Sequence, residues 1–152
     1  MEGLVVRPMA ADDLGQVAML EQTCFPDPWS IQSLAYDLLA NPQAVYYTAV
    51  RGNLVAGYTG LHHILDEGHI MNLAVSHAER RRGVGRCLLS ALVAYAWENS
   101  LGFLTLEVRV SNGAALALYE SFGFKREGLR TSYYKKPLED AIIMTLKTAV
   151  DS

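Results

Sequence analysis

A segment rich in arginine and glycine, AERRRGVGRCLL at residues 78–89, lies between a strand-like run and a helix-like run and restricts what the chain can fold into. It holds four arginines and two glycines, Arg80, Arg81, Arg82, Arg86, Gly83 and Gly85. A helix N-terminus presents unpaired N–H groups and the positive end of the helix dipole, and glycines let an anion approach that backbone closely. The segment therefore predicts a phosphate-binding turn between a strand and a helix; a solvent-exposed basic turn is the alternative.

The spacing of the glycines excludes two common nucleotide-binding loops. A P-loop requires GxxxxGK[ST], a pattern that is absent from the sequence. A dinucleotide-binding fold requires GxGxxG soon after a strand, but Leu88 occupies the third glycine position and the run SHAERRR separates the strand-like residues from Gly83. Four positive charges suit a pyrophosphate with a further phosphate nearby.

Length and composition predict one soluble globular domain over residues 1–152. Of the 152 residues, 51% are apolar and 19% charged, and the sequence has no repeat at a fixed period. The N-terminus lacks a leader pattern and no apolar run approaches a membrane span, so a cytoplasmic protein without a membrane partner is expected. Cys24 and Cys87 lie far apart and outside any CxxC pair, which argues against a disulfide framework or a cysteine zinc site.

Charge is distributed unevenly along the chain. Residues 1–79 carry nine acids and two bases, and residues 80–152 carry seven acids and eleven bases, so the net charge of −3 divides into −7 and +4. One half is suited to a cationic ligand and the other to an anionic one, although charge counts alone favour the simpler explanation that solvated faces differ by chance.

The hydrophobic periodicity predicts an α/β protein. Helices are expected over residues 12–25, 31–41, 84–100 and 114–122. Strands are expected over residues 4–9, 69–76, 103–110, 124–130 and 141–147, with a hairpin over 44–64 that turns at Gly52-Asn53. These elements predict a mixed, mostly antiparallel sheet of about seven strands flanked by about four helices.

The run FLTLEVRV at residues 103–110 alternates between two faces of a strand. The apolar face is formed by Leu104, Leu106, Val108 and Val110, and the polar face by Thr105, Glu107 and Arg109. Glu107 is therefore expected to point away from the apolar side. A surface ion pair between Glu107 and Arg109 is the simplest interpretation of these residues alone.

Several blocks of the sequence together resemble a known family of enzymes. Residues 80–85, RRRGVG, fit the pattern R/Q-x-x-G-x-G/A of the GCN5-related N-acetyltransferases (GNAT). More narrowly, NLAVSHAERRRGVGRCLL, LEVRVSNGAALALYESFGF and YYKKPLEDAIIM resemble the ribosomal-protein alanine N-acetyltransferase (RimI) family, and FPDPWS resembles its loop between the first two helices. The resemblance spans nearly the whole chain and implies the GNAT fold.

The resemblance implies acetyl-CoA as the co-substrate and assigns it a set of residues. Backbone amides around the glycines would hold the pyrophosphate, and a strand edge would pair with the pantetheine arm. The implied cofactor-binding residues are Leu73, Ala74, Val75, Arg80, Arg81, Arg82, Gly83, Val84, Gly85, Arg86 and Asn112. Asn112 is equally well explained as the N-cap of the following helix.

The resemblance also implies two catalytic residues, Glu107 as general base and Tyr119 as general acid. From the sequence alone, Tyr119 is as easily a core residue of the helix over 114–122. A covalent route through Cys87, near a helix start beside Arg86, is a rival to direct attack in a ternary complex. Packing as a small apolar residue is the simpler role for this cysteine.

Three aromatic residues, Trp29, Tyr133 and Tyr134, match the family loops that border the acceptor, and ordinary aromatic packing is the alternative. No metal site is expected. His62 and His63 point to opposite faces of a strand, and His69 and His77 are isolated in the sequence.

The resemblance implies N-α-acetylation of a protein N-terminus, with the N-terminal alanine of the eighteenth small-subunit ribosomal protein as the expected acceptor. One alternative is a GNAT enzyme for a small amine such as a polyamine, an aminoglycoside or an amino acid. Another is a non-catalytic module that binds RNA or the ribosome, which ranks low because no aromatic platform accompanies the arginines and the chain is acidic overall. Direct nucleic-acid binding is therefore not expected.

Overall fold

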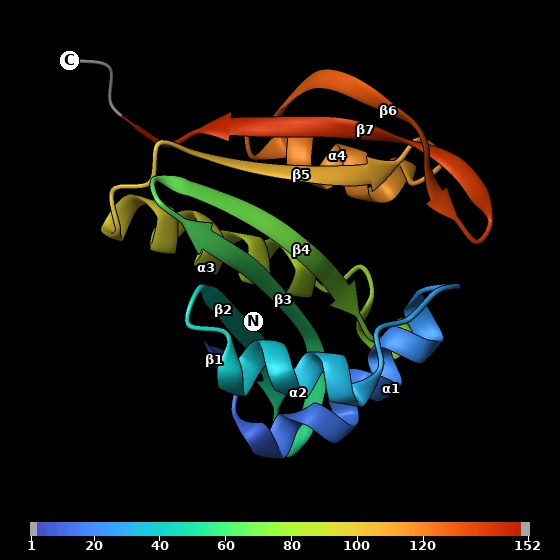
Figure 1. Cartoon of the computed structure of the whole chain (residues 1–152). Coiled ribbons are helices and arrows are strands. Elements are labelled where there is room, and N and C mark those ends of the chain that lie inside the picture. Colours follow the sequence, from blue (N-terminus) through green and yellow to red (C-terminus); the bar gives the residue numbers. More distant parts are fainter. Residues whose placement is uncertain (1–2, 150–152) are drawn as a thin grey trace.

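The structure, a computed structural model, describes residues 3–149 as one twisted seven-stranded sheet with helices on both faces (Figure 1). The strands are β1 (Leu4–Pro8), β2 (Ala44–Arg51), β3 (Leu54–Ile64), β4 (Glu67–Val75), β5 (Phe103–Arg109), β6 (Lys125–Lys135) and β7 (Leu138–Lys147). The α-helices are α1 (Leu14–Cys24), α2 (Ile31–Ala40), α3 (Val84–Glu98) and α4 (Gly113–Ser121). The predicted fold class is confirmed, whereas a single domain over 1–152 stays a prediction because residues 1, 2 and 150–152 lie outside the described residues.

Most predicted elements agree with the observed ones within two residues, and the last hairpin is the exception. Its strands β6 and β7 extend to Lys135 and Leu138 and turn at Lys136-Pro137. Register shifts between Arg126 and Gly128 and between Arg130 and Tyr134 break the alternation of β6, which explains why periodicity ended the predicted strand too early. The predicted place of Val110 on the apolar face is also wrong, because Val110 lies outside β5 and is 42% exposed.

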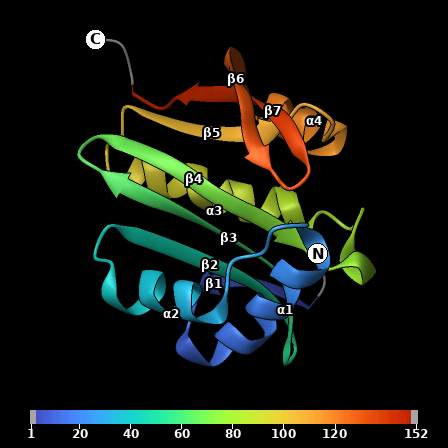
Figure 2. The same ribbon diagram turned by 45° about the vertical axis from the view of Figure 1, so that its right-hand side comes forward.

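Two helical layers cover the sheet (Figures 1 and 2). Helices α1 and α2 pack on one face with a cluster that includes Val17, Leu34 and Tyr58. Helices α3 and α4 pack on the other face, where Leu89 and Leu92 are fully buried. Burying one such leucine contributes about 1.5–3 kcal/mol, so this layer holds α3 firmly against the sheet. Across residues 3–149, none of the helices has the length and apolar character needed to cross a membrane.

The sheet order is β1-β2-β3-β4-β5-β7-β6, with β4 and β5 as the parallel pair at its centre. These two strands pair over three positions, Glu67 with Phe103, Gly68 with Leu104 and His69 with Thr105. Beyond them β4 continues to Val75 and β5 to Arg109 while the strands diverge (Figure 1). The edge of β4 that faces β5 is thus left unpaired after His69, and this divergence creates the space for a site.

Candidate active site

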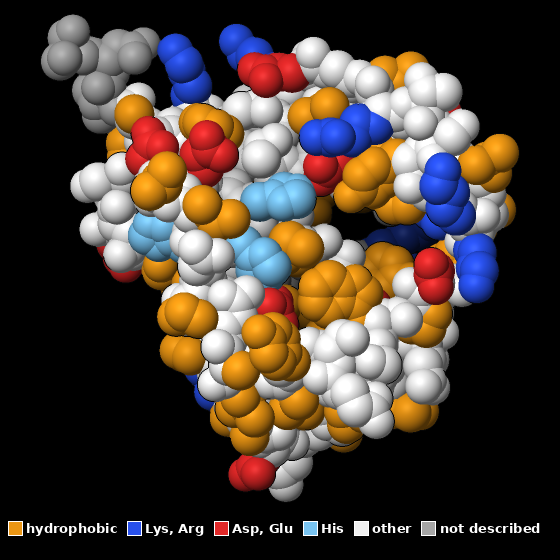
Figure 3. Space-filling model, in the orientation of Figure 1, with side chains coloured by type: hydrophobic (Ala, Val, Ile, Leu, Met, Phe, Trp, Pro, Cys, Tyr) orange, Lys and Arg blue, Asp and Glu red, His pale blue; other side chains and the backbone are white. Residues whose placement is uncertain are grey.

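Two adjoining cavities occupy the space between the diverging strands. We call them the wide cavity, of about 320 Å³, and the narrow cavity, of about 190 Å³. Both are lined by Phe25, Pro26, Ile70, Met71, Asn72, Glu107, Arg109 and Tyr134. Figure 3 shows a hollow between the part of the molecule formed by β5 to β7 and the part that carries α1 and α2, with hydrophobic and basic side chains around it. Ligands that enter the two cavities would therefore meet beside these shared residues.

Glu107 lies at the junction of the cavities, on the polar face of β5 as its alternation predicted. Its Oε2 is 2.6 Å from Nε2 of His69, and its Oε1 is 3.5 Å from Nε of Arg130. The hydrogen bond from His69 holds the pKa of the Glu107 carboxyl below its usual range, so this group is ionised at neutral pH. A surface pair between Glu107 and Arg109 is not formed, because Arg109 pairs with Glu139 at 3.1 Å.

Tyr119 is a core residue of α4 that also reaches the narrow cavity. Its side chain is buried against the edge of the Phe124 ring, with ring centroids 5.4 Å apart. Burial raises the pKa of its phenol, so the hydroxyl keeps its proton at neutral pH. The structure therefore brings Tyr119 and Glu107 to the same narrow cavity, while their chemical roles stay predictions.

The arginine and glycine segment forms an open turn at the start of α3. Gly83 adopts a left-handed conformation with φ of 81° directly before Val84, the first residue of the helix. Arg80 turns back to the carbonyl oxygen of Val75 at 3.3 Å, and Arg82 contacts Glu79 at 3.3 Å. The segment thus places the N–H groups of the first turn of α3 beside exposed arginines, as a phosphate site requires.

Gly85 lies where α3, α4 and β4 approach one another. A Cβ atom at this position would lie 3.3 Å from Cδ2 of Leu118 and 3.7 Å from Cδ2 of Leu73. Glycine therefore leaves the space between these three elements without a side chain, and we call this space the passage. Arg86 borders it on the α4 side, where it donates to Oγ of Ser121 at 3.0 Å.

The remaining predicted cofactor residues occupy β4 and the start of α4. Leu73 lines the narrow cavity, whereas Ala74 is buried in the core on the α1 face. Asn112 is the N-cap of α4, because its side chain accepts a hydrogen bond from the amide of Ala115 at 3.2 Å. It also lines the narrow cavity, so both interpretations of Asn112 hold at once.

The three predicted acceptor-side aromatics all line the wide cavity. Trp29, in the loop between α1 and α2, is half-buried. Tyr133 and Tyr134 on β6 contact each other edge to face. The guanidinium of Arg109 lies 4.1 Å from the centroid of the Tyr134 ring, and the Tyr134 hydroxyl donates to the carbonyl oxygen of Glu107 at 3.3 Å. The aromatics therefore serve both packing and cavity lining.

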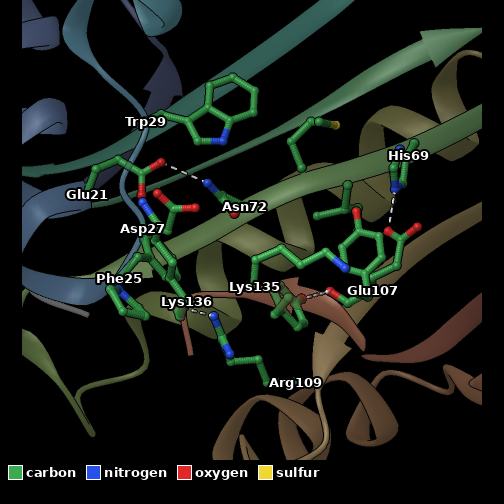
Figure 4. A pocket seen from close by; sticks show the side chains of 15 residues that line it. Glu21, Phe25, Asp27, Trp29, His69, Asn72, Glu107, Arg109, Lys135 and Lys136 are labelled. Carbon is green, nitrogen blue, oxygen red and sulfur yellow. Dashed lines mark hydrogen bonds and ion pairs between the residues drawn. The ribbon is translucent and has the colours of Figure 1, made fainter. Parts of the chain in front are cut away.

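Two groups that sequence reasoning missed complete the wide cavity (Figure 4). Glu21, on the otherwise apolar stripe of α1, is fully buried and accepts hydrogen bonds of 2.8 Å from the Tyr58 hydroxyl and the Asn72 amide. A carboxylate on an apolar stripe was the available signal. His69 is not isolated, as the sequence had suggested, since it is bonded to Glu107. Cys87, in contrast, lines neither cavity.

Comparison with known proteins settles the family. The model of the acetyltransferase (GNAT) family matches residues 14–124, from the start of α1 to Phe124, just past the end of α4. The chain belongs to the GNAT acetyltransferase family. The resemblance that the blocks of sequence suggested is confirmed, and this GNAT chain is an acetyltransferase.

Close relatives narrow the comparison. This GNAT chain is 34% identical over 143 residues to the ribosomal protein bS18-alanine N-acetyltransferase of Escherichia coli strain K12, covering 93% of this chain and 95% of that protein. It is 36% identical over 149 residues to the N-α-acetyltransferase RimI of Mycobacterium tuberculosis, covering 94% and 92%. A crystal structure of the E. coli ribosomal-protein-S18-alanine N-acetyltransferase superposes with a TM-score of 0.90 at 32% identity, covering 98% of this chain and 96% of that one.

Proposed function

We propose that this GNAT acetyltransferase transfers an acetyl group from acetyl-CoA to the N-terminal alanine of ribosomal protein bS18. The observation that carries the proposal is the pair of cavities that meet at Glu107, one beside the predicted cofactor strand and the other beside the acceptor aromatics. The E. coli relative is named for this activity and the M. tuberculosis relative is named as an N-α-acetyltransferase, and each matches more than nine-tenths of the chain. The proposal places the protein in the cytoplasm with a ribosomal protein as its partner.

The residues present fit acetyl-CoA. The first turn of α3 offers backbone N–H groups, the arginines offer positive charge, and Gly85 leaves free the space that a Cβ atom would fill. The unpaired edge of β4 beyond His69 can hydrogen-bond an extended amide chain in the manner of an added strand. Asn112 and Leu73 line the narrow cavity and would contact the part of acetyl-CoA that enters it. When bound, acetyl-CoA supplies the acetyl group as a reactive thioester.

The wide cavity suits the amine of a protein N-terminus. Its lining includes the carboxylates Glu21, Asp27 and Glu107 and the indole of Trp29. An α-ammonium group has a pKa of about 8, so removing its proton at pH 7 costs about 1.4 kcal/mol, against about 4.6 kcal/mol for a lysine ammonium group. A carboxylate at the junction of the cavities can assist the smaller of these two steps.

In the proposed reaction Glu107 serves the removal of a proton from the acceptor amine, and Tyr119 serves as the general acid that protonates the leaving thiolate. The Glu107 carboxylate assists the loss of a proton from the acceptor ammonium group, and the freed lone pair attacks in a ternary complex. Tyr119 holds its proton beside the narrow cavity, where the departing thiolate needs one. Attack without a covalent enzyme intermediate is favoured because Cys87 lies outside both cavities.

Mass spectrometry tests the proposed function. A mixture of purified ribosomal proteins, incubated with acetyl-CoA with and without the enzyme, is expected to show a gain of one acetyl group on the N-terminal alanine of bS18. A peptide of the same N-terminus, compared with spermidine, an aminoglycoside and free alanine, separates protein acetylation from acetylation of a small amine. Acetylation of a small amine alone would replace the proposed acceptor, and salt-dependent RNA binding without affinity for CoA would overturn the catalytic role.

A further inference from the structure

His69 on β4 and Glu107 on β5 form a hydrogen-bonded pair across the point where the two strands diverge. The pair is set by the sheet register, because His69 is the last residue of β4 that pairs with β5 and Glu107 lies two residues beyond its partner Thr105. The distance from Nε2 to Oε2 is 2.6 Å, which is short for a hydrogen bond between nitrogen and oxygen. Figure 4 shows the His69 ring directed at the Glu107 carboxylate.

The ionisation of Glu107 fixes the direction of this hydrogen bond. An ionised carboxylate has no hydrogen to donate, so Nε2 of His69 carries the hydrogen and donates it to Oε2. In the neutral ring, Nδ1 then has a lone pair and can accept a proton. The carboxylate also stabilises the positive charge that the ring acquires on protonation.

The two members of the pair differ in how accessible they are. Oε2 of Glu107 accepts the hydrogen bond from His69, Oε1 lies 3.5 Å from Nε of the exposed Arg130, and the Glu107 side chain is 12% exposed. The His69 side chain is 35% exposed and lines the wide cavity but not the narrow one. An acceptor amine in the wide cavity therefore reaches the imidazole more readily than the carboxylate.

We propose that His69 is the group that takes the proton from the acceptor amine and that Glu107 acts through it as a positioning residue. This inference rests on the proposed function and deepens it, because it changes which side chain of the site touches the acceptor. It also explains how Glu107, a largely buried carboxylate already bonded to His69, can assist the removal of a proton from the acceptor.

The protons balance along this route. Nδ1 of His69 takes one proton from the acceptor ammonium group and later returns it to water. The freed nitrogen lone pair forms the new bond to the acetyl carbon while the carbon–sulfur bond breaks and its electron pair goes to sulfur. The thiolate takes the Tyr119 proton, and the second proton lost by the nitrogen restores the phenol through solvent.

Charged and titratable groups surround His69 on each neighbouring element. From β5 it faces Glu107, and from the β6 side Arg130 and Tyr133 lie near the same carboxylate. Lys135 of β6 also lines the wide cavity. From β3, His62 lies opposite His69 in the register, and its Nε2 contacts Asp37 at 2.7 Å. His62 lines neither cavity, so the chain offers a second histidine bonded to a carboxylate as a matched control.

The test compares H69Q, H69A and H62Q in the full chain, with the acceptor that the parent enzyme acetylates. Glutamine at position 69 can still donate to Glu107 but cannot take a proton at neutral pH. We expect H69Q to lower kcat about 100-fold with little change in the KM for acetyl-CoA. H62Q is expected to keep the parent kcat.

Chemical rescue separates a catalytic role from a structural one. Added imidazole is expected to raise the kcat of H69A about tenfold and to leave the kcat of the parent and of H62Q unchanged. A kcat of H69Q within about twofold of the parent, or an H69A loss that imidazole does not relieve, would overturn the inference. The proposed function is judged separately, by whether the parent enzyme acetylates the bS18 peptide at all.

Discussion

The side-chain amide of Asn72 on β4 donates a 2.8 Å hydrogen bond to Oε1 of Glu21, a carboxylate that α1 buries completely. The Tyr58 hydroxyl donates to the same oxygen, while Oε2 has no partner among the described residues. Glu21 thereby joins one helix to two strands at the wall of the wide cavity. Burying an ionised carboxylate with an unsatisfied oxygen costs free energy of folding, so the ionisation of Glu21 affects the stability of the protein.

Glu21→Gln is expected to make the protein more stable at neutral pH relative to the parent. Burial raises the pKa of Glu21 above its unfolded value, so the cost of ionising it is absent in acid and grows as the pH rises through the folded-state pKa. Glutamine removes the charge and keeps an oxygen for Tyr58 and Asn72. The gain in free energy of unfolding is expected to be about 1 kcal/mol at pH 7 and to vanish near pH 4. Urea unfolding at both pH values measures it.

The same change at Glu127, which lies exposed on β6, serves as the control. It is expected to alter stability by no more than about 0.5 kcal/mol at either pH. A Glu21→Gln variant that is less stable than the parent, with a loss that grows toward neutral pH, would show that Glu21 is stabilised as the anion.

Tyr119→Phe is expected to lower kcat about 100-fold and to leave the KM for acetyl-CoA nearly unchanged. The phenol lies in the narrow cavity with its pKa raised by burial, so it retains a proton for the leaving thiolate, and phenylalanine has none to give. Because the ring still packs against Phe124, the fold should hold. Steady-state kinetics measure the effect, with Tyr36→Phe on the exposed face of α2 as the control. Equal kcat values for the two variants would remove Tyr119 from the mechanism.

The sequence predicted much of the fold because its local signals are strong. The alternation of β5 placed Glu107 on the polar face, and Gly83 before α3 together with Gly85 in its first turn marked an open helix N-terminus. Both features depend on neighbours within a few residues. Periodicity of this kind records which face of an element is buried, and so it also placed Tyr119 in the core.

The pairing of His69 with Glu107 was not predictable in this way. It depends on the parallel register of β4 and β5, which sets His69 opposite Thr105. The two strands are neighbours in the sheet, but α3 separates them in the sequence. No spacing within one segment encodes that register. The stacking of Arg109 on Tyr134 was hidden for a similar reason, since the register shift between Arg130 and Tyr134 decides where the ring lies.

Gly85→Ala is expected to weaken the binding of CoA about tenfold. The added methyl group would lie 3.3 Å from Cδ2 of Leu118 and 3.7 Å from Cδ2 of Leu73, in the passage between α3, α4 and β4. Leu118 can shift at its flexible end, so the fold is expected to survive while the space for the ligand narrows. Calorimetric titration with CoA measures the affinity.

Gly15→Ala in α1 is the matched control, because a Cβ atom there meets nothing within 4 Å. It is expected to leave CoA binding unchanged and to stabilise the protein by about 0.5–1 kcal/mol. If Gly85→Ala bound CoA as tightly as Gly15→Ala, the passage beside Gly85 would not be part of the cofactor site.

Trp29→Ala is expected to raise the KM for the acceptor peptide about 10- to 30-fold without changing the KM for acetyl-CoA. Trp29 lines the wide cavity and packs against the core cluster beside α1 and α2, but it is absent from the lining of the narrow cavity, so its loss removes apolar contact from the acceptor side and not from the co-substrate side. Trp97→Ala is the control, since Trp97 lies on α3, is 51% exposed and lines neither cavity. The measurement varies each substrate at saturating concentrations of the other. A rise in the KM for acetyl-CoA instead would exchange the assignments of the two cavities, because the indole would then border the co-substrate.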